Sequence, residues 1–375
     1  MGLLRTIFAL SVVFSHLGIY TFVGARNAVQ IFYIISGFLI SYILVESKNY
    51  PNIKHFYFNR ILRIYPIYYF VAFISLLIYP ILDIKFFYII EQTSIIVNIF
   101  LFFSNFFIIG QDWIMFSGIK NNILIFSADF YKSEILLFEG LFIQQAWTLG
   151  LEITFYLIAP FILFNRKIIL TLLILSILLR IYLIKIGIGL KDPWTYRFFP
   201  TELAFFLIGA LSHQILFPFY KKIFNRNIDL VSKLSTYFLI IVSLIWFKIP
   251  IAQYFNSFIL FILITLILPL TFFFSTNNKW DKYIGDLSYP IYIGHFLIIN
   301  IMISLIRSLN LSENTYAVFI REIFDYKFYD SNITIFVIIS IVLSILFALI
   351  LNIYLCNKIE LIRNKYRTNF TKKIV

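Results

Sequence analysis

The chain has 375 residues, of which 61% are hydrophobic and only 13% are charged. Because soluble domains carry roughly 25% charged residues, this composition excludes a soluble globular protein and indicates an integral membrane protein. The net charge of +13 does not indicate nucleic-acid binding, since the basic residues are scattered through short loops and a tail, as the positive-inside rule expects. The single cysteine, Cys356, excludes an internal disulfide and a cysteine-based metal cluster, and we expect no metal.

Apolar runs of about 20 residues, the length that a helix needs to cross a bilayer, recur along almost the whole chain. We therefore predict an all-α, polytopic transmembrane helix bundle of about ten spans plus one re-entrant or interfacial segment. The predicted membrane domain covers residues 1–355, and a basic cytoplasmic tail covers residues 356–375. The positive-inside rule places both termini in the cytoplasm.

The first predicted span, residues 3–23, is a retained helix that runs outward and carries Arg5 and His16. At 100° per residue, the two side chains return to within about 20° of each other and share one helix face, roughly 16 Å apart along the axis. If Arg5 marks the cytoplasmic edge, His16 lies near the middle of the hydrocarbon core. An ionisable group at that depth is costly and indicates function.

The second span carries IFYIISGFLIS over residues 31–41. Ser36 and Gly37 lie near its middle, where small residues let helix backbones approach closely. We favour this packing interpretation over a direct role of Ser36 in ligand binding.

A basic stretch with His55, Arg60 and Arg63 follows, and it faces the cytoplasm. Arg60 and Arg63 are three residues apart and share one helix face. They have two interpretations. Their side chains extend to lipid phosphates and only set the topology, or they form a guanidinium pair that binds a soluble anionic cofactor.

The span at 64–82 returns outward, and residues 86–110 are apolar enough to cross again. Residues 111–146, however, carry several acidic side chains and are predicted to be external. If residues 86–110 cross the membrane, residues 111–146 would lie on the cytoplasmic side, which contradicts their predicted external location. We favour a re-entrant or interfacial segment at 86–110 over a weak span hidden within residues 121–142.

Trp147 opens the next span, WTLGLEITFYLIAP, in which Glu152 and Tyr156 are four residues apart on one face. A carboxylate about one and a half turns inside the membrane must face protein or water. The alternative is a structural ion pair or an interfacial carboxylate that stays in water. After a span at 168–186, the outer loop KDPWTYRFFPTE places Arg197 and Glu202 just before the following span.

Two further spans, at 233–247 and 258–275, lead to LSYPIYIGHFLI, where Ser288, Tyr292 and His295 form a polar stripe on one helix face. His295 lies about 12 Å from the inner edge if that edge is near Leu287. We interpret this histidine as a structural hydrogen-bond partner rather than a catalyst. A polar outer loop at 307–332 precedes the last span, which reaches residue 355.

Five motifs in this order resemble integral membrane acyltransferase family 3, the O-acyltransferases that modify sugars of bacterial surface polysaccharides. They are Arg5-x10-His16, FYIISGFL, Arg60-x-x-Arg63 with Pro66, WTLGLEITFYLIAP and SYPIYIGH. The resemblance covers residues 1–355. RFFPTELAFFLIG also resembles the family's Arg and Glu before a small-residue turn, with looser spacing.

The resemblance implies an acyl-CoA donor, above all acetyl-CoA, bound from the cytoplasm, and a sugar hydroxyl of a cell-surface polysaccharide or glycolipid as acceptor on the outer side of the bacterial plasma membrane. It implies His16 as general base or transiently acylated residue, and Glu152 as the carboxylate that orients the imidazole. Donor binding falls to Arg5, Arg60 and Arg63. Substrate or structural support falls to Ser36, Tyr156, Arg197, Glu202, Tyr292 and His295. We expect the spans that carry His16, Glu152 and His295 to converge, with the His16 and Glu152 side chains within reach of a hydrogen bond or of one bridging water.

A transporter or flippase of a glycan or glycolipid is the competing class, with the buried His and Glu as a proton relay. No internal repeat and no pair of Gly/Pro-broken spans supports it. A lipid-binding scaffold would explain the hydrophobicity but leaves the buried ionisable groups unexplained.

Overall fold

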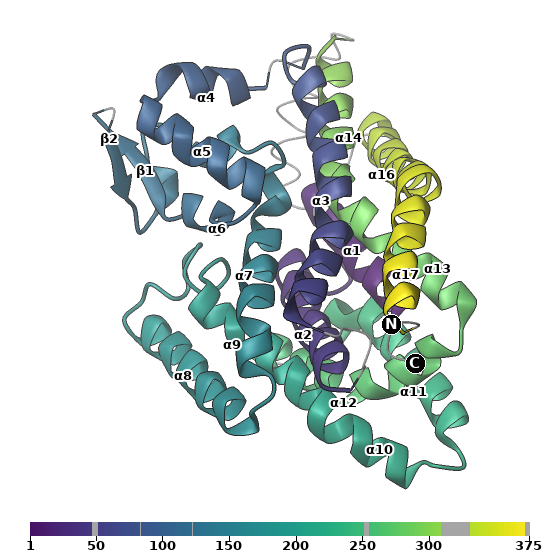
Figure 1. Ribbon diagram of the computed structural model, residues 1–375. Helices are drawn as coiled ribbons and strands as arrows, with labels where there is room; N and C mark the ends of the chain where they lie inside the picture. The colour runs from purple at the N-terminus through teal and green to yellow at the C-terminus, as the bar shows by residue number, and fades with distance from the viewer. Residues whose placement is uncertain (47–51, 83, 122, 251–254, 309–330, 372–375) are drawn as a thin grey trace. The chain divides into compact units, whose positions relative to one another are not determined.

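The computed structural model describes residues 1–46, 52–82, 84–121, 123–250, 255–308 and 331–371. The described chain is an all-α, polytopic membrane bundle with one small β-hairpin (Figure 1). Most of the predicted outer loop at 307–332 and the end of the predicted tail lie outside the described residues. The boundary at residue 355 and the cytoplasmic location of both termini stay predictions.

The elements of the first half are α1 (Gly2–His16), α2 (Ala25–Ser41), the π-helical turn η1 (Tyr42–Glu46), α3 (Ile53–Ile78), α4 (Phe86–Gln92), α5 (Ile95–Phe107), α6 (Gln111–Ile114), β1 (Ser117–Lys120), β2 (Ile123–Phe126), three 3₁₀ turns η2 (Phe130–Lys132), η3 (Leu137–Gly140) and η4 (Gln144–Ala146), and α7 (Trp147–Ile162). The second half contains α8 (Arg166–Lys185), α9 (Phe199–Leu211), the π-helical turn η5 (Ser212–Leu216), α10 (Phe217–Ile223), α11 (Ile228–Ile245), the 3₁₀ turn η6 (Trp246–Lys248), α12 (Asn256–Thr276), α13 (Lys279–Asp286), α14 (Ser288–Ser308), α16 (Ser331–Leu351), the π-helical turn η7 (Asn352–Cys356) and α17 (Asn357–Thr371).

Among the described residues, eight helices are long and apolar enough to cross a membrane. They cover Ala25–Glu46, Ile53–Ile78, Arg166–Lys185, Phe199–Ile223, Ile228–Lys248, Asn256–Thr276, Lys279–Leu305 and Thr334–Asn364. The 15-residue α1 and the 16-residue α7 are shorter, at about 22 to 24 Å. These ten helices occupy the ten segments predicted as spans, of which eight are long and apolar enough to cross.

The segment at 86–110 folds into two short helices, α4 and α5. The 13 residues of α5 reach only about 20 Å, which is too short for a hydrocarbon core of about 30 Å. The described residues from 117 to 146 form the β1–β2 hairpin and 3₁₀ turns rather than a hidden span. The structure therefore agrees with a segment that does not cross as one helix.

The first helix is shorter than the predicted span at 3–23. α1 ends at His16, and Gly18 then adopts a φ of 68°, a left-handed conformation that glycine takes readily and that stops the helix. His16 therefore lies in the last turn of α1, next to its unsatisfied carbonyl groups, instead of in the middle of a continuous span.

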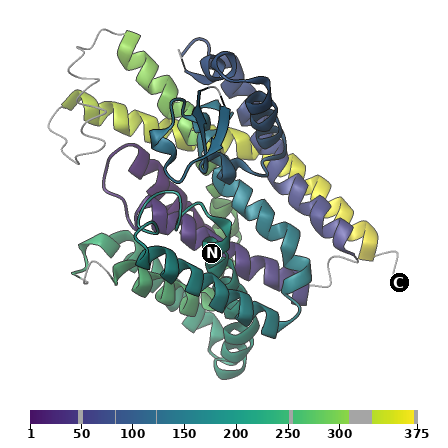
Figure 2. The same cartoon turned by 90° about the vertical axis from the view of Figure 1, so that its left-hand side faces the viewer.

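The described residues divide into two compact units, of which unit 1 combines Met1–Phe32 with Ser212–Val375. Within it, α1 packs against α13 and α14, and α11 packs against α12. α14 also packs against α16, as the light-green and yellow helices of Figure 2 show.

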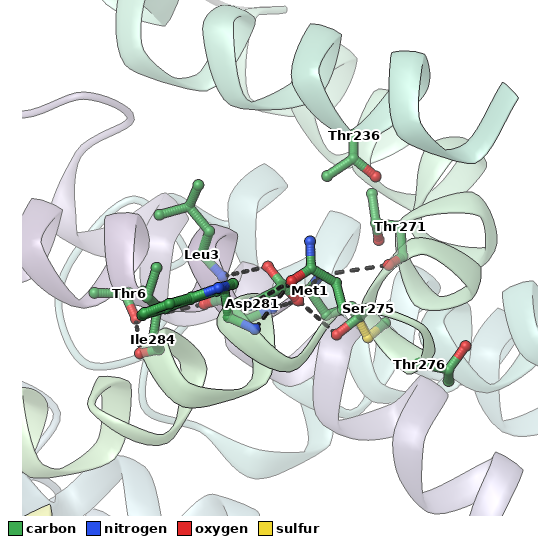
Figure 3. A network of polar contacts seen from close by, with 12 residues as sticks. Met1, Leu3, Thr6, Thr236, Thr271, Ser275, Thr276, Asp281 and Ile284 are labelled. Atoms are coloured by element: carbon green, nitrogen blue, oxygen red, sulfur yellow. Dashed lines mark hydrogen bonds and ion pairs between the residues drawn. The ribbon is translucent and has the colours of Figure 1, made fainter. Parts of the chain in front are cut away.

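The Asp281 side chain of α13 caps the first turn of α1 (Figure 3). Its Oδ2 accepts from the Gly2 backbone N–H at 2.8 Å and from Ser275 Oγ at 2.6 Å, while Oδ1 accepts from the Leu3 N–H at 2.9 Å. Thr6 Oγ1 donates to the Ile284 carbonyl at 2.7 Å one turn further along. Asp281 is 4% exposed, so one buried carboxylate satisfies helix N–H groups that would otherwise lack partners.

Gly2 lets the two helices meet this closely. A Cβ atom at Gly2 would lie 1.7 Å from the Asp281 carbonyl oxygen, and one at Gly285 would lie 2.4 Å from the Gly2 Cα. Both distances exclude any side chain, so this pair of glycines fixes the contact between α1 and α13.

Unit 2 covers Tyr33–Leu211. α8 packs along α9 (Figure 1), and α2 crosses α9 at two glycines. A Cβ at Gly37 would lie 1.8 Å from the Phe206 carbonyl oxygen, and one at Gly209 would lie 1.9 Å from that of Ile34. The packing interpretation is therefore correct for Gly37.

We expect Asp281→Asn to destabilise the protein by about 1 to 3 kcal/mol, because an amide N–H₂ would then face the N–H donors of α1. The measurement is thermal unfolding of the detergent-solubilised protein, followed by tryptophan fluorescence. Asp286→Asn is the matched control, since that side chain is exposed at the end of the same helix. Equal unfolding midpoints for the two variants would show that the Asp281 contacts contribute little.

Candidate active site

Two histidines meet in unit 1. His16 Nδ1 lies 2.9 Å from His295 Nε2, and the two rings are nearly parallel, 11° apart, with centroids 5.1 Å from each other. The Phe296 ring packs edge-on against His16 at 4.8 Å. His295 is fully buried on α14, and its hydrogen bond to His16 makes it a partner of the first candidate catalytic residue, while a structural rather than catalytic role for it stays a prediction.

The hydrogen bonds determine which ring nitrogens carry protons. His295 Nδ1 lies 2.7 Å from the Tyr292 carbonyl oxygen, which only accepts, so Nδ1 is the donor. In a neutral His295, Nε2 then accepts, and His16 Nδ1 must donate to it. This places the lone pair of neutral His16 on Nε2. The same bond persists when His16 gains a proton, because Nδ1 is a donor in both states.

The predicted catalytic carboxylate belongs to a polar cluster of unit 2. Glu152 Oε1 accepts from Ser36 Oγ at 2.8 Å and from the Tyr156 hydroxyl, and the two hydroxyl oxygens lie 3.4 Å apart. Ser36 comes from α2, whereas Glu152 and Tyr156 stand one turn apart on α7. Ser36 therefore donates a hydrogen bond to Glu152, whereas Gly37 beside it serves helix packing. The packing interpretation alone does not describe Ser36.

Arg60 on α3 is buried, with 4% of its surface exposed. Its guanidinium donates to Asn59 Oδ1 at 2.9 Å and lies over the Phe56 and Tyr156 rings at 5.7 and 5.8 Å. Its buried Nε has no hydrogen-bond partner among the described residues. A side chain that extends to lipid phosphates keeps its charged head exposed, so the topology-only interpretation does not describe Arg60. Arg63 is half-buried one turn later, and Arg5 is half-buried in α1.

Arg197 and Glu202 do not pair with each other. Arg197 binds Asp192 in bidentate fashion at 2.8 to 3.0 Å, with its guanidinium 4.2 Å from the Trp147 ring centroid at the start of α7. Glu202 is fully buried and pairs with Arg180 at 2.5 Å. Both residues therefore have structural partners within unit 2.

Sequence reasoning missed Arg180, Asp192 and Asp281 as partners. The sequence could have predicted a role for Arg180, since a lone arginine inside the apolar span ILTLLILSILLRIYLIK requires a buried acidic partner. Asp192 and Asp281 had none, because each stands in a short polar stretch that resembles an ordinary loop.

Outside the membrane-spanning helices, burial raises the pKa of Asp112 to about 7. Its Oδ1 has no hydrogen-bond partner among the described residues and would lie 3.1 Å from a Cβ at Gly150 on α7. α6 therefore packs closely against α7 at Gly150, which lies two residues before Glu152.

The described side chains include no group of three His, Cys, Asp or Glu residues that would hold a metal ion. The groups that suit an anionic donor are the guanidinium groups of Arg60 and Arg63, with Arg5 in unit 1. The convergence of Glu152 with His16 stays a prediction, since the two belong to different units.

A family model described as an acyltransferase domain matches residues 1–353. No curated protein and no solved structure matches the chain. The match covers nearly all of the spans, the histidine pair and the Glu152 cluster. This chain therefore belongs to acyltransferase family 3, a family of membrane acyltransferases.

Proposed function

We propose that this membrane acyltransferase transfers an acyl group, acetyl in the first instance, from acyl-CoA to a sugar hydroxyl of a cell-surface polysaccharide or glycolipid. The donor binds from the cytoplasm, and the acceptor reaches the site from the outer side of a bacterial plasma membrane. The observation that carries the proposal is the His16–His295 hydrogen bond, because it orients the lone pair of His16 on Nε2 for use as a base.

In the proposed transfer, one proton moves from the sugar hydroxyl to His16 and then to the leaving thiolate. His16 Nε2 takes the proton of the sugar hydroxyl while the oxygen attacks the thioester carbonyl carbon. The carbon–sulfur bond then breaks, an ester forms, and the leaving thiolate takes the proton back from His16. His295 holds the ring through Nδ1 during both proton transfers, the role that a carboxylate has in a catalytic triad.

Positive charge on His16 needs stabilisation during the reaction. His16 lies in the last turn of α1, where the carbonyl groups of the helix end favour a cation by about 0.3 to 1 kcal/mol. We assign the remaining stabilisation to the Glu152 carboxylate, which Ser36 and Tyr156 hold in place. Because His295 occupies Nδ1, Glu152 acts through its charge rather than by orienting the ring.

Donor binding falls to Arg60 and Arg63, with Arg5 as support. A buried guanidinium without a carboxylate beside it is costly, and an anionic phosphate would remove that cost. Arg60 meets this description, since its guanidinium contacts a neutral amide and two aromatic rings.

We expect His16→Ala to lower acetyl transfer to an oligosaccharide acceptor by at least 10²–10⁴-fold, because the base is lost. Glu152→Gln should also be strongly impaired, since it keeps the shape but not the charge. The assay uses labelled acetyl-CoA at matched protein levels, with CoA binding as the control for folding. If His16→Ala keeps more than about a tenth of wild-type activity, His16 is not the general base. The transporter or flippase alternative would then be favoured.

His295→Ala should reduce kcat by roughly 10²-fold, because His16 loses the acceptor that selects its tautomer. His295→Gln should recover part of that loss, since its amide oxygen can accept from His16 Nδ1 in place of Nε2. KM for the donor should change little in both variants. Equal kcat values for the alanine and glutamine variants would show that the hydrogen bond does not orient His16.

Arg60→Gln should raise KM for acetyl-CoA by on the order of tenfold, with a smaller effect on kcat, because charge-assisted hydrogen bonds to phosphate are lost. Arg166→Gln is the control, since Arg166 is exposed at the start of α8. Unchanged donor KM in the Arg60 variant would assign Arg60 a structural role through its aromatic contacts.

A further inference from the structure

Asn352 is a buried amide side chain without partners. It is 1% exposed, and neither its Oδ1 nor its Nδ2 has a hydrogen-bond partner among the described residues. Each buried polar group left unsatisfied costs about 1 to 3 kcal/mol, so leucine at this position would be cheaper for folding alone. Folding stability therefore does not explain the asparagine at this position, and we look for a role in binding.

Two buried serines of the preceding helix α16 have hydrogen-bond partners. Ser340 Oγ donates to the Phe336 carbonyl and Ser344 Oγ to the Ser340 carbonyl, each at 2.7 Å. Asn352 differs from them also in its backbone, because it opens the π-helical turn η7 at the end of α16. Such turns occur frequently at functional sites.

One contact gives the depth of Asn352 along α14. A Cβ at Gly294 would lie 2.7 Å from the Phe347 ring. α14 and α16 pack against each other and run in opposite directions (Figure 1), so Asn352, five residues after Phe347, lies level with the first turn of α14. His295 is then about 9 Å further along α14.

This depth matches the arm of the donor. In an extended acyl-CoA, the two amide groups of the arm lie roughly 4 to 9 Å from the thioester sulfur. If the thioester reacts at His16, which contacts His295, the farther amide comes level with Asn352. A secondary amide offers one N–H and one C=O, which complement the unsatisfied Oδ1 and Nδ2 of Asn352.

We infer that Asn352 binds an amide group of the donor's arm and thereby sets the depth of the thioester at the histidine pair. The inference rests on the proposed function, because it takes acyl-CoA as the donor. It extends that function by assigning a residue of the last span, for which the sequence offered no role, to donor recognition.

The experiment compares wild type, Asn352→Leu and Asn352→Asp as full-length purified protein. CoA and adenosine 3′,5′-bisphosphate, which lacks the arm, are titrated against each. For Asn352→Leu, the Kd for CoA should rise on the order of tenfold while the Kd for the bisphosphate stays unchanged. The unfolding midpoint should stay equal or rise, because an unsatisfied amide is removed. Ser344→Ala, on the same buried stripe, should leave both Kd values unchanged.

The outcomes separate this inference from the proposed function. An unchanged CoA Kd in Asn352→Leu overturns the inference, as does equal weakening of both ligands. If Asn352→Leu fails to fold, Asn352→Asp decides, since it keeps the shape but loses the Nδ2 donor and should weaken CoA alone. Wild type that binds CoA without transferring acetyl overturns the proposed function but leaves the Asn352 comparison valid. Wild type that binds no CoA overturns both.

Discussion

The position of α1 depends on the buried Asp281 carboxylate. Its two oxygens accept from the Gly2 and Leu3 N–H groups, and the glycines at 2 and 285 let the two helices approach closely enough for these hydrogen bonds. Because α13 leads directly into α14, the same pair of helices contacts α1 again at the other end, through His16 and His295. A helix held at both ends keeps the imidazole of His16 at one depth, which the proposed proton transfer from the sugar hydroxyl requires.

The hydrocarbon environment explains why most buried polar groups of this protein occur in sets. Arg180 with Glu202, Glu152 with Ser36 and Tyr156, and His16 with His295 each satisfy one another, since water is not available to do so. Among the described residues, several buried side-chain atoms depart from this rule, and they include Arg60 Nε, Arg180 Nε and both amide atoms of Asn352. Such departures are costly for folding, and they are therefore the places where a ligand is best sought.

The histidine pair also bears on the choice between chemistry and transport. A proton relay passes its proton onward, whereas the bond from His295 Nδ1 to the Tyr292 carbonyl ends on an atom that does not take up a proton. In the proposed transfer, His16 instead regains the same Nε2 lone pair once the thiolate has taken the proton. That behaviour suits a general base, and it agrees with membership of an acyltransferase family.

The sequence by itself determined the membrane class, the approximate positions of the apolar helices and the family, and it singled out His16, Glu152 and Arg60 as candidate site residues. These follow from local properties, namely apolar runs, charge and short motifs. The sequence also predicts that the spans of His16 and His295 converge. The tertiary structure alone decided that α1 stops at His16, that the His16 and His295 rings form a direct hydrogen bond, and that Glu202 pairs with Arg180 rather than Arg197. Hydrogen bonds require atoms within about 3 Å of each other, and only the packing of helices distant in sequence sets such distances.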